Sequence, residues 1–319
     1  MTFLIDRDTR VLIQGITGTL GRFVVSMMAG AGLAPVAGVT PGRGGTSVDG
    51  VPVFDTIDEA RRATGADASL VLVPAAGLRD AVLEAIDERL STVALMVDGV
   101  PLGLSLDLIS AAADAGVTLV GPNSPGVIAP GRCLLGALDP RRFTPGRVAI
   151  VSRSGGMMST LAHTLTAAGF GQSTCVGIGG DSVIGLDMPA ALRLAEADPD
   201  TDATVVFGEI GTTQEERVAA LIAAGQLTKP IVVYIAGRAA PPGIRYSHAG
   251  AQSEGNRGTA ASKIETLRTA GALIAERYTD VPRLLARARL SAGAGAAIGS
   301  SGGDATAGGA STGSTAGRG

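Results

Sequence analysis

The chain has 319 residues, 45% of them hydrophobic, which exceeds the usual size of a single core and predicts two packed domains. A formal net charge of -3, with 3% aromatic residues and no tryptophan, offers neither a basic face nor stacking platforms, so nucleic acid is not expected as a partner. No stretch is apolar enough to span a bilayer and no signal-peptide core is present, so we expect a cytoplasmic or organelle-matrix protein without a membrane anchor. Cys133 and Cys175 are too few for a disulfide framework or a cysteine-built zinc site, and no metal site is expected.

In the first part of the chain, short β-branched runs alternate with helical stretches rich in Ala and Leu. The runs at 11–15, 34–40, 69–74, 92–98 and 118–123 predict strands. Because several of them are almost continuously apolar, we expect a parallel sheet that is covered by helices on both faces. Residues 1–125 are therefore interpreted as a Rossmann-like domain.

Residues 126–146 interrupt this alternation and are interpreted as a connection between domains. Strand-like runs resume at 148–154, 173–180, 203–211, 230–237 and 272–277, which predicts a second open parallel sheet over residues 147–290. The expected fold class is α/β with two open parallel-sheet domains. Residues 291–319 consist mainly of Gly, Ala, Ser and Thr and cannot bury a core, so a disordered low-complexity tail is expected.

Glycines mark the expected helix ends. Gly116, Gly169 and Gly271 each follow an apolar stretch, where a left-handed residue would close a helix.

The segment 11–21 predicts a ligand site near the amino terminus. A strand runs into a glycine-rich turn and then a helix, so backbone N–H groups and the helix dipole would converge on an anion. The glycines do not follow the spacing of the dinucleotide fingerprint, and no acidic residue closes the second strand. Arg43 stands near that position and favours a ligand with a phosphate on its ribose. Coenzyme A and NADP both carry one, so an NADP-linked oxidoreductase remains an alternative.

A second candidate site surrounds His248, in the loop after the run 230–237. Open α/β sheets bind ligands at the carboxyl ends of their strands, and a neutral imidazole is a competent nucleophile toward phosphoryl groups. Glu209, at the end of another strand, could accept a ring N–H and orient the imidazole. His163 falls in a helical stretch and is interpreted as an ordinary helical histidine.

A phosphate-binding turn is expected near His248. Ser154 ends the run 148–154, and Gly155 and Gly156 lead from it into a helix, whose amino terminus suits an anion. Together with Glu209 and His248 they would form a cradle for a phosphohistidine.

The motifs QGITGTLG, GVTPGRGGT, GPNSPGVIAPG, VSRSG, GFGQSTCVGIGGD, GEIG and HAGA occur in this order within residues 2–288. In this combination the chain resembles the α subunits of the succinate–CoA ligase family. The resemblance implies a CoA-binding domain followed by a flavodoxin-like ligase domain. It also implies an acid–thiol ligase activity, with a place in the tricarboxylic acid cycle. It also implies a partner β subunit, in an αβ or α2β2 assembly, whose ATP-grasp domain holds ATP or GTP with Mg2+.

The resemblance assigns roles to individual residues. His248 would carry a phosphoryl group between the nucleotide and a small carboxylic acid, with Glu209 beside it. Asn123 and Ser159 would lie at the acid site. The implied CoA contacts are Thr17, Gly18, Thr19, Leu20, Arg43, Met96, Val97 and Asp98.

Ser159 and Thr160 depart from the family pattern, which has Tyr followed by Glu at these positions. The family's Tyr contributes to the carboxylate site, so a paralogue acting on malate or a citrate-like acid is an alternative. A CoA-binding regulatory module without turnover is a further alternative, against which His248 and the GEIG motif argue.

Overall fold

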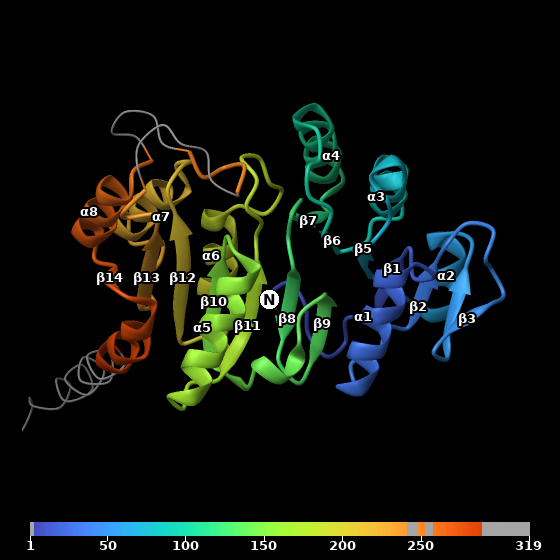
Figure 1. The fold of residues 1–319 in the computed structure, drawn as a ribbon, viewed down its shortest axis with the longest axis horizontal. Helices are drawn as coiled ribbons and strands as arrows, with labels where there is room; N and C mark the ends of the chain where they lie inside the picture. The colour runs from blue at the N-terminus through green and yellow to red at the C-terminus, as the bar shows by residue number, and fades with distance from the viewer. Residues whose placement is uncertain (1–2, 241–247, 253–257, 289–319) are drawn as a thin grey trace, which may run out of the picture.

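The computed structural model describes residues 3–240, 248–252 and 258–288 (Figure 1). The first half forms a seven-stranded sheet in the order β3-β4-β2-β1-β5-β6-β7. Its strands are β1 (Val11–Gln14), β2 (Ala37–Val39), β3 (Ser47–Val48), β4 (Val51–Phe54), β5 (Ala68–Val71), β6 (Thr92–Leu95) and β7 (Thr118–Val120). Its helices are α1 (Thr19–Gly30), α2 (Ile57–Thr64), α3 (Leu78–Asp87) and α4 (Leu102–Ala115).

The second half forms another seven-stranded sheet, in the order β14-β13-β12-β10-β11-β8-β9. Its strands are β8 (Gly126–Ala129), β9 (Cys133–Gly136), β10 (Pro145–Ser152), β11 (Gln172–Gly177), β12 (Ala203–Glu209), β13 (Ile231–Ala236) and β14 (Leu273–Ile274). Its helices are α5 (Gly155–Ala167), α6 (Met188–Ala197), α7 (Gln214–Ala223) and α8 (Ala260–Ala270). Short 3-10 turns occur at Ala75–Gly77, Pro140–Arg142 and Tyr278–Asp280, and residues 281–288 are helical.

The expected fold class is confirmed, because both sheets are mostly parallel and each apolar run named above contains a strand. Burial explains this agreement: every residue of β1, β5, β6 and β12 is buried. The expected left-handed glycines are also present, with φ of 71° at Gly116, 82° at Gly169 and 106° at Gly271.

The interpretation of 126–146 as a connection overlooked β8 and β9. These strands form an antiparallel hairpin that pairs with β11 and packs against β5 and β6 (Figure 1). The hairpin needs glycine, because a Cβ on Gly126 would lie 2.1 Å from the carbonyl oxygen of Leu135. The hairpin thus joins the two halves, while the domain boundaries at 125 and 147 stay predictions and the tail at 291–319 lies outside the described residues.

The apolar core is continuous between the sheets. One cluster of buried residues includes Ile13 of β1, Leu134 of β9 and Ile150 of β10. A second cluster fills the other face of the first sheet, beneath α3 and α4. Across the parts of the chain that are described, no helix combines the length and the apolar character needed to cross a membrane.

The strand order indicates where ligands of each sheet would bind. β1 lies between β2 and β5, and β10 lies between β11 and β12, so the chain reverses its direction of winding at each of these central strands. Ligands of open α/β sheets bind at the carboxyl ends of strands at such switch points.

Candidate functional site

The first site lies at the carboxyl ends of β1 and β5, where a cavity of about 920 Å3 opens. Gly15 has φ of 80°, and a Cβ there would lie 2.9 Å from the carbonyl oxygen of Leu72, so the turn requires glycine. Gly18 caps α1 without a side-chain hydrogen bond, which leaves the first N–H groups of the helix for a ligand. The expected residues Thr17, Gly18, Thr19 and Leu20 all line this cavity.

Arg43 lines a smaller cavity of about 230 Å3, which shares Thr17 with the first. The loop that carries it is held by Asp55, whose carboxylate accepts from the backbone N–H groups of Arg43 and Gly44 at 2.9 and 2.8 Å. Arg22, which the sequence did not single out, lines the same cavity. A phosphate at this position would therefore meet two guanidinium groups.

Met96, Val97 and Asp98 follow β6 at the same edge of the sheet, but they line neither cavity. The carbonyl of Val97 instead accepts from the N–H of Asn123 at 2.9 Å. The larger cavity also has a wall that the sequence reasoning missed, formed by the end of the predicted strand run at 69–74 and the residues after it. This wall consists of Leu72, Val73, Pro74, Gly77, Asp80, Ala81 and Glu84.

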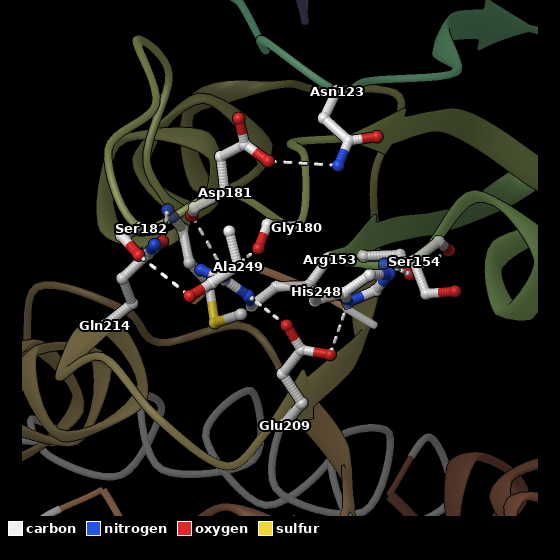
Figure 2. Close-up of polar contacts among 12 residues, drawn as sticks. Asn123, Arg153, Ser154, Gly180, Asp181, Ser182, Glu209, Gln214, His248 and Ala249 are labelled. Carbon is white, nitrogen blue, oxygen red and sulfur yellow. Dashed lines mark hydrogen bonds and ion pairs between the residues drawn. The ribbon is translucent and has the colours of Figure 1, made fainter. Parts of the chain in front are cut away.

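The second site is built around the carboxylate of Glu209, at the end of β12. Its Oε2 lies 2.7 Å from Nδ1 of His248, so the expected contact between these two residues is present. Its Oε1 accepts from Nε of Arg153 at 2.8 Å. Figure 2 shows the carboxylate between the guanidinium and the imidazole ring, with one oxygen turned to each. The neighbouring strands β10 and β12 thus bring together Arg153 and Glu209 beneath the loop histidine.

The electrostatics of this trio follow from burial and pairing. The Arg153 side chain is fully buried, that of Glu209 is 8% exposed, and that of His248 is 25% exposed. Burial pushes the pKa of Glu209 upward, but the hydrogen bond with His248 and the charge of Arg153 outweigh it, so the pKa is lowered. The hydrogen bond to Glu209 raises the pKa of His248 against the effect of desolvation.

The loop around His248 rests on the segment after β11. A Cβ on Gly180 would lie 2.6 Å from Cγ of the imidazole, so the ring packs directly on glycine backbone. The N–H of Gly250 donates to the carbonyl of Gly180 at 3.0 Å. Ser182 Oγ donates to the carbonyl of Ala249 at 3.1 Å (Figure 2). The two residues that follow His248 are therefore held to the segment 180–182 by hydrogen bonds to their backbone.

A second buried ion pair, between Glu215 and Lys263 of α8, contacts the backbone of Glu209. The backbone N–H of Glu209 donates to Glu215 Oε1 at 3.0 Å. The side chains of Glu215 and Lys263 are both fully buried. Because α8 follows the loop that carries His248, this pair fixes the far end of the loop to the strand that carries Glu209.

The amino terminus of α5 borders another cavity, of about 410 Å3. Ser154 caps this helix and accepts from the N–H of Met157 at 3.4 Å. Gly155, Gly156 and Ser159 line the cavity, together with Arg142. Neither His248 nor Glu209 lines this cavity, so the cradle expected around a phosphohistidine stays a prediction.

Asn123 lies apart from that cavity. Its Nδ2 donates to Asp181 Oδ1 at 3.0 Å, which links the end of β7 to the segment beneath His248 (Figure 2). Among the described residues, His, Cys, Asp and Glu form no cluster of three that could hold a metal ion.

Known proteins resemble the chain along most of its length. The family model described as CoA binding domain matches residues 6–99, and the one described as CoA-ligase matches residues 151–273. The ADP-forming succinate–CoA ligase subunit alpha 2 of Archaeoglobus fulgidus is 47% identical over 286 residues, which cover 90% of this chain and 99% of that protein. The corresponding alpha subunit of Methanothermobacter thermautotrophicus is 46% identical over 278 residues, covering 87% and 94%.

A solved structure shares the fold. The ATP citrate lyase from Methanothrix soehngenii, in complex with citrate and coenzyme A, superposes with a TM-score of 0.81 at 24% identity over 91% of this chain. The match covers 51% of that lyase chain, so this chain spans about half of its length. With nearly half of its residues identical to the archaeal proteins over almost their whole length, the chain belongs to the family of succinate–CoA ligase α subunits.

Proposed function

We propose that the chain is the α subunit of an acyl-CoA ligase that forms a nucleoside diphosphate, and that His248 relays the phosphoryl group. The observation that carries this proposal is the contact of Glu209 with Nδ1 of His248 at 2.7 Å. In the neutral ring, Nδ1 donates its proton to Glu209, and the lone pair of Nε2 is left to attack phosphorus. Figure 2 shows Nδ1 turned toward Glu209, which leaves the opposite edge of the ring for this attack.

The proposed reaction has three transfers. In the direction of acyl-CoA formation, Nε2 of His248 attacks the terminal phosphorus of the nucleotide, and the nucleoside diphosphate leaves with the bridging oxygen. A carboxylate oxygen of the acid then attacks the same phosphorus, which breaks the N–P bond and gives an acyl phosphate. The sulfur of CoA finally displaces phosphate from the acyl carbon. Throughout, Glu209 holds the proton at Nδ1 so that Nε2 keeps its orientation.

The groups that bind CoA and the phosphoryl oxygens are assigned to the strand ends at the two switch points. The cavity of about 920 Å3 beside α1 is wide enough for CoA, with Arg43 and Arg22 near its ribose phosphate. The first N–H groups of α5, next to Ser154, Gly155 and Gly156, contact the phosphoryl oxygens. Met96, Val97 and Asp98 remain proposed CoA contacts at the same sheet edge.

A partner supplies what this chain does not. We propose a β subunit with an ATP-grasp domain that holds ATP or GTP with Mg2+, in an αβ or α2β2 assembly. The relatives' designation as alpha subunits supports a second subunit.

The acid is the open part of this proposal. Ser159 leaves a cavity where the family's Tyr would stand, which favours a bulkier or hydroxylated acid such as malate or a citrate-like acid over succinate. The oxidoreductase alternative loses its support, because Arg43 fits CoA equally well and the family is that of a ligase.

His248→Asn should abolish phosphorylation and leave CoA binding intact, because the two sites lie at different sheets. The complex with its partner is incubated with γ-labelled nucleotide, and acid-labile, base-stable label is expected on the wild type alone. His163→Asn is the matched control, since His163 is the other of the two histidines of the chain and is exposed on α5. Equal labelling of His248→Asn and wild type would remove His248 from this role.

The rate of phosphorylation should rise with pH through a midpoint above the ordinary histidine value, because only the neutral ring is nucleophilic and Glu209 raises the pKa of His248. Glu209→Gln should move this midpoint downward and lower the plateau rate by about 10- to 100-fold, since the amide orients the ring poorly. Initial rates of label incorporation across pH test this. A profile that Glu209→Gln leaves in place would contradict the assignment.

Arg43→Ala should weaken CoA more than dephospho-CoA, which lacks the 3′-phosphate. A charge-assisted contact of this kind contributes about 1.5 to 3 kcal/mol. Calorimetry with both ligands measures the difference, and Arg62→Ala is the control, since Arg62 is an exposed arginine of α2 that lines neither cavity. An equal loss for both ligands would place Arg43 away from the 3′-phosphate.

Succinate should not be the best acid. Specificity constants of the reconstituted complex are compared for succinate, malate, citrate, glutarate and monocarboxylates, and Ser159→Tyr should shift the preference toward succinate. If succinate leads by more than about tenfold, or roughly 1.4 kcal/mol in transition-state binding, the substrate shift is wrong. Thr160→Ala, on the same turn of α5 but outside the cavity lining, is the control variant.

A further inference from the structure

Arg153 is a fully buried cation that contacts Glu209 directly, and the proposed reaction gives it no role. Its side chain is fully buried at the end of β10. Nε donates to Glu209 Oε1 at 2.8 Å, and Nη2 donates to the carbonyls of Gly180 and Asp181, both at 3.1 Å. One guanidinium therefore joins the end of β12 to the segment on which the histidine rests.

The fit around this guanidinium is close. A Cβ on Gly250 would lie 2.5 Å from Nη2 of Arg153, so the loop two residues after His248 packs directly on it. Nη1 is buried and has no hydrogen-bond partner among the described residues. A charged group that is buried with one donor unmatched is costly, so its presence beside the candidate nucleophile calls for an explanation.

We propose that Arg153 is a positioning residue: it occupies one oxygen of Glu209 so that the other faces Nδ1 of His248, and it supplies the countercharge that keeps the ring available as a nucleophile. This inference rests on the proposed phosphohistidine relay. Arg153 itself contacts neither nucleotide nor acid; it acts through Glu209 and through the backbone of Gly180 and Asp181.

The charges that face His248 explain why a countercharge matters. Glu209 from β12 and Asp181 from the segment after β11 both favour the protonated ring, whereas Arg153 from β10 is the opposing charge. A carboxylate that paired with His248 alone would hold the ring as an imidazolium, which has no lone pair on Nε2. Arg153 shares that carboxylate and so leaves a neutral ring at a lower pH. Glu215 lies beyond Glu209 and is matched by Lys263.

A purely structural ion pair is the competing explanation, and the titration of His248 separates the two. The chain has two histidines, so long-range 1H–15N spectra of the full chain give two imidazole titrations, and His163 serves as an internal reference. Arg153→Met removes the charge at similar length, and Arg153→Lys keeps the charge. Arg132→Met is the matched control, because Arg132 also pairs with a carboxylate, Asp200, and with a backbone carbonyl in the same sheet.

Arg153→Met should raise the titration midpoint of His248 and leave that of His163 unchanged, whereas Arg153→Lys and Arg132→Met should stay near wild type. The pH profile of phosphorylation in the complex should move in the same direction, with about a tenfold or greater loss of rate near neutral pH and no change in the affinity for CoA. A midpoint of His248 that is unchanged or lowered in Arg153→Met overturns the proposal.

Calorimetric CoA binding and the thermal midpoint show whether each variant is folded. If Arg153→Met does not fold, Arg153→Gln takes its place, since it lacks the charge but keeps an amide donor for a backbone carbonyl. The failure of the underlying function looks different: a wild-type complex that takes no label on His248 refutes the relay, while the two imidazole titrations still decide the role of Arg153.

Discussion

The carboxyl edge of the second sheet depends on the pairing of buried charges. Arg153 and Lys263 are fully buried cations, and each is matched by a carboxylate, Glu209 and Glu215 respectively. A lone ion at that depth would be strongly destabilising, and removing one partner of a buried pair costs about 3 to 5 kcal/mol. Because the backbone N–H of Glu209 donates to the Glu215 carboxylate, the two ion pairs are joined in one series of contacts from Arg153 to Lys263. The ends of β10 and β12 and the helices α7 and α8 are thereby linked to one another. His248 lies at the Glu209 end of this series of contacts.

The two halves of the molecule use the same topological device for different chemistry. In each sheet the direction in which successive strands are added reverses at a central strand. Ligands of open α/β sheets bind at the carboxyl ends of the strands beside such a reversal. In the first sheet the ends carry glycine-rich backbone and open a wide cavity. In the second they carry Arg153 and Glu209 and support a histidine. The hairpin β8–β9 and the bond from Asn123 to Asp181 connect the halves, so the two sites belong to one packed body.

The sequence predicted most of the fold, because buried parallel strands are continuous apolar runs and their patterns are local. It missed the hairpins β3–β4 and β8–β9, whose strands are only two to four residues long and carry too little of an apolar pattern to stand out. At the second site it predicted the contact between His248 and Glu209. It gave Arg153 no role, since an arginine between two serines resembles a surface cation. Its burial arises only when three separate segments, around Glu209, Gly180 and Gly250, close over it.

The glycine beneath the imidazole has a consequence for how the histidine can move. Side chains that support a catalytic ring usually have rotamers of their own and can yield by turning about a single bond. Glycine has no side chain that could turn, and the ring of His248 lies against the position that a Cβ of Gly180 would occupy. The height of the ring above the sheet is therefore set by main-chain geometry. Moving the ring closer to the sheet would then require a rearrangement of the backbone around Gly180, because no side chain lies there that could change its rotamer.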